Sequence, residues 1–104
     1  MIEIKKYIDG ITVTGHAGYA PIGQDIVCAS ISTLTETLIA SLMELTVNDV
    51  KVHKEPGDVR IKTGNELTDT AELLVDSFFI GVEGVQGTYP EYITTELINS
   101  FMPN

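Results

Sequence analysis

The sequence predicts an α+β fold, a two-layer sandwich of order β-β-α-β-β-α in which two helices cover one face of an antiparallel sheet. Two observations predict this order: two pairs of short alternating segments joined by glycine-containing turns, and two longer segments with apolar residues every three or four positions. The length of 104 residues, 43% of them hydrophobic, is typical of one compact domain. Residues 1–104 are therefore expected to form a single domain.

The first hairpin is predicted at the start of the chain, with Asp9 and Gly10 as its turn. Asp-Gly is a common sequence for a two-residue type I′ turn between strands. In this register one face of the hairpin carries Ile2, Ile4, Ile8, Ile11 and Val13. The alternation predicts strands with one buried face.

A loop and then a long helix are predicted next. Residues 15–23 interrupt regular structure, because they include Gly15, Gly18, Pro21 and Gly23. A helix from about Asp25 to Thr46 follows, with Asp25 as its N-cap. Its apolar face consists of Val27, Ile31, Leu34, Leu38, Leu42 and Leu45.

In the second half of the chain a hairpin and then a helix are predicted again. Residues 47–53 and 58–63 alternate around Pro56 and Gly57 and predict a second hairpin. Asp69, three residues before Glu72, predicts a capped helix that runs to about Gln86. For residues 93–98 the pattern leaves two alternatives open, a short edge strand or an irregular tail.

The formal charge of −9, with six Lys and Arg, argues against nucleic acid as a partner, because such binding needs clustered cations. No membrane span is expected either, because Thr33, Thr35, Glu36 and Thr37 interrupt the longest apolar helix. One cysteine, and a start without a secretory apolar region, indicate a cytoplasmic protein.

The chemistry of the chain is expected around Cys28. If Asp25 caps the long helix, Cys28 is near its positive end, where a thiolate is stabilised and backbone N–H groups are available to an oxyanion. At about 100° per residue, Asp25, Cys28 and Ser32 lie on one flank of the helix. His16, in the preceding loop, is the candidate base.

A structural interpretation of the same residues is also open. A lone cysteine on a helix is usually a small buried hydrophobe, and Asp25 is explained by capping alone. His53 is the rival imidazole. No metal site or cofactor is predicted, because one cysteine and two histidines show no ligand spacing and the loop glycines match no nucleotide-binding motif.

The segment "GHAGYAPIGQDIVCASIS", residues 15–32, resembles the signature of the ribosomal-processing cysteine protease (Prp) family, which includes bacteriophage members. That signature is close to G-H-A-x-Y-A-x-x-G-x-D-I-V-C-A-A-x-S. The match is nearly complete, with Ser30 standing where the family more often has alanine. A weaker resemblance extends over the rest of the chain, including the final helix and residues 89–93.

The resemblance implies a small, often homodimeric peptidase that removes an N-terminal extension from a ribosomal protein or, in bacteriophages, trims capsid or scaffold proteins. It implies Cys28 as nucleophile and His16 as general base and acid, with supporting roles for Asp25 and Ser32. It also implies a mobile loop that orders over the substrate, here containing Gly15, Gly18, Tyr19, Pro21 and Gly23.

Two other functions remain open from the residues. The same fold is compatible with a non-catalytic homodimeric module that binds proteins through its acidic surface. It is also compatible with a thiol hydrolase or acyltransferase for a small molecule, although no phosphate-binding motif favours that activity.

Overall fold

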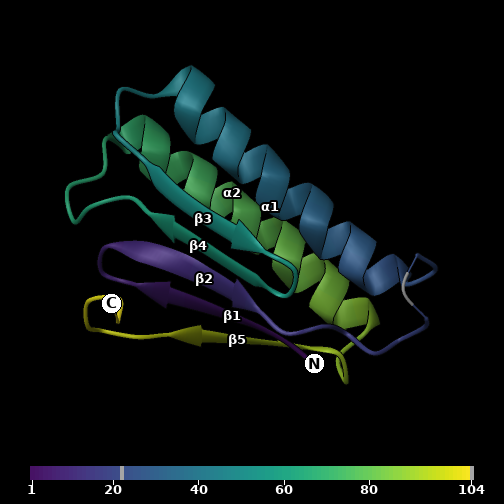
Figure 1. Ribbon diagram of the computed structural model, residues 1–104. Coiled ribbons are helices and arrows are strands. Elements are labelled where there is room, and N and C mark those ends of the chain that lie inside the picture. Colours follow the sequence, from purple (N-terminus) through teal and green to yellow (C-terminus); the bar gives the residue numbers. More distant parts are fainter. Residues whose placement is uncertain (22, 104) are drawn as a thin grey trace.

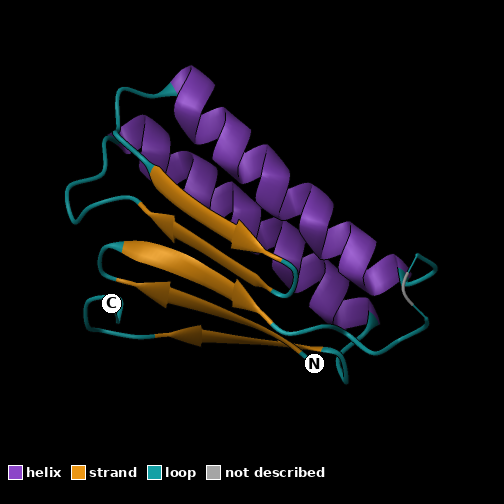
Figure 2. Ribbon diagram, viewed as in Figure 1, coloured by secondary structure: helices purple, strands orange, loops and turns teal. Residues whose placement is uncertain are grey.

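The computed structural model describes residues 1–21 and 23–103, so residue 22 of the predicted loop lies outside the described residues. Five strands form one sheet in the order β3-β4-β2-β1-β5, and both helices cover the same face of it (Figures 1 and 2). The elements are β1 (Ile2–Tyr7), β2 (Gly10–Thr14), α1 (Ile26–Leu45), β3 (Lys51–Glu55), β4 (Asp58–Lys62), α2 (Asp69–Thr88) and β5 (Ile93–Leu97). The predicted two-layer α+β fold is confirmed.

The sheet is mixed rather than wholly antiparallel, because β5 pairs in parallel with β1. The remaining pairs, β1 with β2, β2 with β4 and β3 with β4, are antiparallel as expected. Of the two alternatives left open for residues 93–98, the structure contains the edge strand. Only Ile93 of β5 is buried, so the strand lacks the alternation of buried and exposed residues from which a strand is predicted.

The first turn differs from its prediction by one residue. The two-residue loop consists of Ile8 and Asp9, and Gly10 already belongs to β2. The predicted type I′ turn is wrong, because it requires positive φ at both central residues and neither Asp9 nor Gly10 has one. The Asp9 carboxylate instead accepts the N–H of Met102 at 2.8 Å, and its carbonyl accepts the N–H of Thr63 at 2.8 Å. Ile8 is consequently 41% exposed and lies outside the core.

The second hairpin and α2 follow the predicted order with shifted bounds. The turn at Pro56 and Gly57 is confirmed, but β3 begins only at Lys51, and Val47 is 90% exposed. Helix α2 is capped by Thr68 and not by Asp69, because the Thr68 hydroxyl accepts the Ala71 N–H at 3.2 Å. The helix is antiparallel to α1 (Figure 1).

The core lies between the sheet and the two helices and draws on every element except β3. Its largest fully buried side chains are Ile4, Ile11, Val27, Ile31, Leu42, Ile61, Val75, Val82 and Ile93. All of them except Val75 and Ile93 are apolar positions that the alternation and the helical spacing assign to the inner faces.

In the described part of the chain, α1 is long enough and apolar enough to cross a membrane, with a mean hydropathy of 1.6 over its most apolar window. Thr33, Thr35, Glu36 and Thr37 therefore do not interrupt the apolar character of α1, contrary to expectation. The core helix of a soluble protein has the same length and apolar composition. Here one face of α1 packs into the core through Val27, Ile31, Thr35, Leu38, Ile39 and Leu42.

Candidate active site

Asp25 joins the start of α1 to the loop that precedes it. Its Oδ1 accepts the N–H groups of Val27 at 3.0 Å and Cys28 at 2.9 Å, which confirms the predicted N-cap. Its Oδ2 accepts the N–H groups of Tyr19 at 3.0 Å and Ala20 at 3.4 Å. The N–H groups of Cys28, Tyr19 and Ala20, with that of Cys28 first, hold the pKa of the Asp25 carboxyl below its usual range. One carboxylate thus sets the position of the loop relative to the helix.

Cys28 is the third residue of α1, as predicted, and is half-buried. Its side chain packs against the edge of the core. The backbone N–H of Ala17, which is itself buried, donates to the Cys28 sulfur at 3.3 Å. The sulfur is therefore neither sealed inside the protein nor fully exposed, and it has a hydrogen-bond donor that the sequence pattern did not reveal.

His16 lies against the turn of the second hairpin. The Gly15 N–H donates to the Gly57 carbonyl at 2.9 Å, which holds the loop beside that turn. Gly57 has a φ of +73°, and a Cβ added there would lie 2.7 Å from His16 Nε2. Glycine is thus required at position 57 for two reasons, its backbone conformation and the close approach of the imidazole.

Two cavities meet at His16 and Cys28. The smaller has a volume of about 290 Å³ and extends toward Thr35, Glu36 and Val59. The larger has a volume of about 740 Å³ and extends along the loop and the start of α1, past Ala20, Pro21 and Ile26. Both are lined by His16, Cys28, Ser32 and Pro56. An extended chain that occupied both cavities would place a backbone group beside the sulfur.

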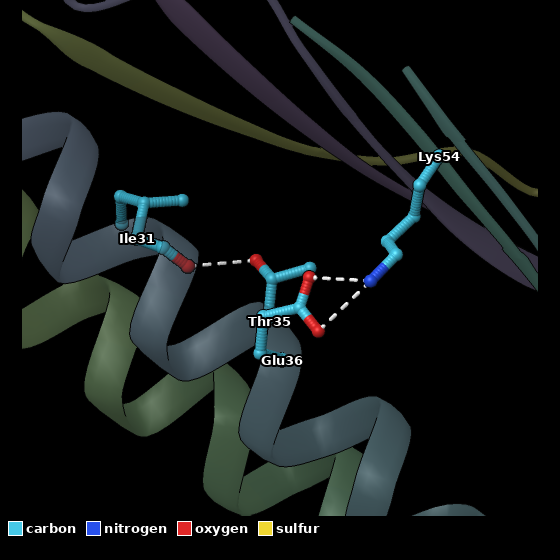
Figure 3. Close-up of polar contacts among 4 residues, drawn as sticks. All are labelled: Ile31, Thr35, Glu36 and Lys54. Carbon is cyan, nitrogen blue, oxygen red and sulfur yellow. Dashed lines mark hydrogen bonds and ion pairs between the residues drawn. The ribbon is translucent and has the colours of Figure 1, made fainter. Parts of the chain in front are cut away.

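Ile31, Thr35 and Glu36 of α1 line the smaller cavity, and Figure 3 shows their polar contacts with one another and with Lys54 of β3. The Thr35 hydroxyl donates to the Ile31 carbonyl at 2.7 Å, so this buried polar group is satisfied. Lys54 of β3 donates to both carboxylate oxygens of Glu36, at 3.0 and 3.1 Å. Both side chains of this ion pair are about half exposed, so the pair orients Glu36 more than it stabilises the fold.

The remaining predicted residues are placed as follows. Ser32 is exposed one turn after Cys28 and lines both cavities with it, whereas Asp25 turns to the backbone of the loop and the helix. Gly18, Pro21 and Gly23 line only the larger cavity, and Gly15 lines only the smaller. Tyr19 is not among the described residues that line either cavity.

The rival imidazole, His53, lies on β3 and is not among the described residues that line the two cavities. It belongs to a cluster with Glu55 and Asp58 whose ligand atoms lie within 4.8 Å of one another. These carboxylates already have side-chain partners, since His53 Nε2 lies 3.3 Å from Glu55 and Arg60 Nε lies 3.2 Å from Asp58. The pairing of β3 with β4 creates this cluster, so the sequence spacing did not indicate it.

The helix-start N–H groups are less available than the sequence suggests. The N–H groups of Val27 and Cys28 donate to the Asp25 carboxylate, and the N–H of Ala29 donates to the Asp25 carbonyl at 3.0 Å. The expectation that these groups receive an oxyanion is wrong for this arrangement. The Ala17 N–H, which points at the sulfur, is the better placed donor.

Comparison with known proteins agrees with this geometry. A family model described as cysteine protease Prp matches residues 1–94. The chain belongs to the Prp family. It is therefore a cysteine-type peptidase, and the resemblance seen in residues 15–32 is confirmed. A relative named ribosomal processing cysteine protease Prp, from Staphylococcus aureus, is 24% identical over 88 residues, which cover 83% of this chain and 83% of the relative.

Crystal structures of Prp from Staphylococcus aureus share the fold. One, in complex with a covalently linked product peptide, has a TM-score of 0.89 and 21% identity, covering 94% of this chain and 100% of that chain. Another, in complex with a substrate peptide, has a TM-score of 0.77 and 20% identity over the same shares. The mixed sheet with two helices on one face is thus the fold of Prp.

Proposed function

We propose that this Prp enzyme is an endopeptidase that removes a short N-terminal extension from a ribosomal protein, or from a phage capsid or scaffold protein if the chain is a phage member. Cys28 is the nucleophile and His16 the general base and acid. The observation that carries the proposal is the meeting of two cavities at these two side chains. The ribosomal substrate is supported by the name of the Staphylococcus aureus relative.

In the first step Cys28 loses its proton to His16 and attacks the scissile carbonyl carbon. A carbon–sulfur bond forms, and the carbonyl electron pair moves to oxygen. Before the attack, the Ala17 N–H stabilises negative charge on the sulfur. After it, the oxyanion lies two bonds from the sulfur, and the Ala17 N–H is available to it.

In the second step protonated His16 gives its proton to the leaving amine as the peptide carbon–nitrogen bond breaks. A water molecule, deprotonated by His16, then attacks the thioester and releases the acyl half of the substrate. The departing sulfur takes the proton from His16, so the enzyme returns to its starting state. His16 is an exposed residue of the loop, so water can reach it.

Asp25 and Ser32 support this chemistry in different ways. Asp25 is a positioning residue, because its carboxylate holds the loop amides and the first turn of α1 together. Ser32 lines both cavities together with Cys28 and is placed to contact the bound peptide. His16, Gly18, Ala20, Pro21 and Gly23 of the loop line the larger cavity, and the loop gates entry of the substrate.

We further propose that residues 1–104 act as a single cytoplasmic domain, as a homodimer, with a polypeptide and neither nucleic acid nor membrane as partner. All six Lys and Arg side chains lie on β1, β3 and β4, and neither helix carries one. The acidic helix layer therefore disfavours a polyanion. Sedimentation equilibrium measures the dimer directly, and a monomer at micromolar concentration would refute it.

The test of the proposed function is cleavage of peptides that represent N-terminal extensions of ribosomal and phage structural proteins. The substitutions Cys28→Ser and His16→Ala are expected to abolish cleavage while the circular dichroism spectrum is unchanged. His53→Ala is the matched control, because His53 is an exposed imidazole outside both cavities. Loss of cleavage in His53→Ala with retention in His16→Ala would refute the assignment, and a wild-type protein that cleaves no such peptide would refute the substrate class.

A further inference from the structure

The ring of Tyr19, in the loop before α1, lies between two tyrosines from another part of the chain. Its centroid is 5.4 Å from that of Tyr89 and 5.3 Å from that of Tyr92, with interplanar angles of 78° and 77°. Both contacts are edge-to-face pairs, an arrangement that stabilises aromatic rings beyond the area they bury. We call these three residues the tyrosine cluster.

Two members of the tyrosine cluster are held by regular structure. Tyr89 caps the end of α2, where its N–H donates to the Val85 carbonyl at 2.9 Å. The carbonyl of Tyr92 accepts the N–H of Ile2, at the start of β1, at 2.9 Å. Both side chains are half-buried and pack against the core. They therefore present a fixed surface to Tyr19, which is 42% exposed.

The loop links Tyr19 closely to the reacting atoms. Two residues before it, the Ala17 N–H contacts the Cys28 sulfur, and three residues before it is His16. The N–H of Tyr19 itself donates to the Asp25 carboxylate. Because each residue spans at most about 3.6 Å of chain, the loop has little slack between the ring and the sulfur. Displacement of the Tyr19 ring would also displace these contacts.

We infer that Tyr89 and Tyr92 are positioning residues of the active site: they hold Tyr19, and through it they keep the Ala17 N–H on the nucleophile and His16 at the junction of the cavities. As a statement about catalysis, this inference rests on the proposed function. The contacts are made by ring edges and faces, so the rings and not the hydroxyl groups carry them.

Amide hydrogen exchange tests the tyrosine cluster without a substrate. In Tyr19→Leu and Tyr92→Leu, loss of edge-to-face contacts is expected to speed exchange at the amides of Ala17 and Ala20 by about five- to tenfold, because exchange follows the fraction of open loop. Tyr19→Phe and Tyr92→Phe are expected to exchange at the wild-type rate. Tyr7→Leu is the matched control, since Tyr7 lies on β1 outside the tyrosine cluster.

Peptide cleavage supplies the second readout. Opening of the loop lowers the fraction of enzyme that is competent to bind, so KM is expected to rise by up to about tenfold in the leucine variants while kcat is nearly retained. The phenylalanine variants are expected to restore KM. A merely structural role would not produce this division between KM and kcat together with rescue by phenylalanine.

The inference is overturned if the leucine variants exchange at the wild-type rate, or if the phenylalanine variants are as fast as the leucine variants. Tyr92→Leu also removes a core contact, so Tyr19→Leu decides if Tyr92→Leu fails to fold. Equal acceleration at the amides of β1 and β2 in Tyr19→Leu would mean global loosening and would also overturn it. A wild-type enzyme that cleaves no peptide would contradict the proposed function, whereas the exchange result would stand.

Discussion

The close approach of Gly57 to His16 allows a test of the base by a substitution outside the predicted catalytic residues. In Gly57→Ala the new Cβ would lie 2.7 Å from His16 Nε2, about 0.7 Å inside the 3.4 Å at which ordinary contact begins. The imidazole is exposed and free to yield, so it will be displaced rather than the backbone. Since a shift of about 1 Å in a catalytic group costs about 100-fold, we expect kcat/KM to fall by about 10- to 100-fold.

The stability cost of this substitution comes from the backbone. Gly57 has a φ of +73°, and placing alanine in the left-handed region costs about 1–2 kcal/mol. For a domain of this size a loss of 1 kcal/mol lowers Tm by about 4–8 °C. Thermal unfolding measured with cleavage separates this loss from the loss of activity.

Gly64 supplies the control for this experiment. It has nearly the same φ, +76°, but a Cβ added there meets nothing within 4 Å. Gly64→Ala is therefore expected to lower Tm by a similar amount and to leave kcat/KM close to wild type. If the kcat/KM of Gly57→Ala falls no further than that of Gly64→Ala, the imidazole at position 16 is not the catalytic base.

Three further predictions concern the stability of the fold. The lowered pKa of Asp25 means that its ionised form stabilises the fold above the unfolded pKa of 3.8 and that this contribution is lost as pH falls through the folded pKa. The difference in free energy of unfolding between wild type and Asp25→Asn should therefore shrink below about pH 4, and a constant difference would contradict the hydrogen bonds assigned to the carboxylate. Gly84→Ala, in open space on α2, should stabilise the fold by about 0.5–1 kcal/mol in urea unfolding. Gly81→Ala should stabilise it less, because the new Cβ would lie 2.7 Å from Leu34. Equal gains from the two substitutions would contradict this packing of the helices. Ile4→Val should cost about 0.5–1.5 kcal/mol in the same assay, because Ile4 is fully buried, and no loss would contradict its place in the core.

Features that depend on neighbouring residues were predicted well. Helix α1 begins after Asp25, because a carboxylate two or three residues before free N–H groups caps them wherever the helix lies. The position of Cys28 in the first turn follows from that cap. The turn at Pro56 and Gly57 is equally local, because proline favours a turn and glycine accepts the positive φ found there.

Features that depend on distant partners were predicted poorly or missed. The first turn lies one residue earlier than predicted, because the N–H groups of Met102 and Thr63 donate to Asp9. The sequence of the hairpin itself does not indicate these distant partners. The capping of α2 by Thr68 rather than Asp69 is a smaller error of the same kind, since the Thr68 hydroxyl also donates to Asn48, at 2.8 Å. Tertiary contacts thus determined which of several local turn and cap positions of similar energy is occupied.

By itself the sequence determined which residues form the helices, where the cysteine lies on the first of them, and that a glycine-rich loop carrying a histidine precedes it. These properties follow from side-chain periodicity and capping, which act over a few residues. The tertiary structure alone decided that β5 joins the sheet in parallel to β1, that the His16 imidazole lies against Gly57, and that Tyr89 and Tyr92 pack against Tyr19. Each of these contacts joins segments far apart along the chain, so it forms only when packing of the core brings the segments together.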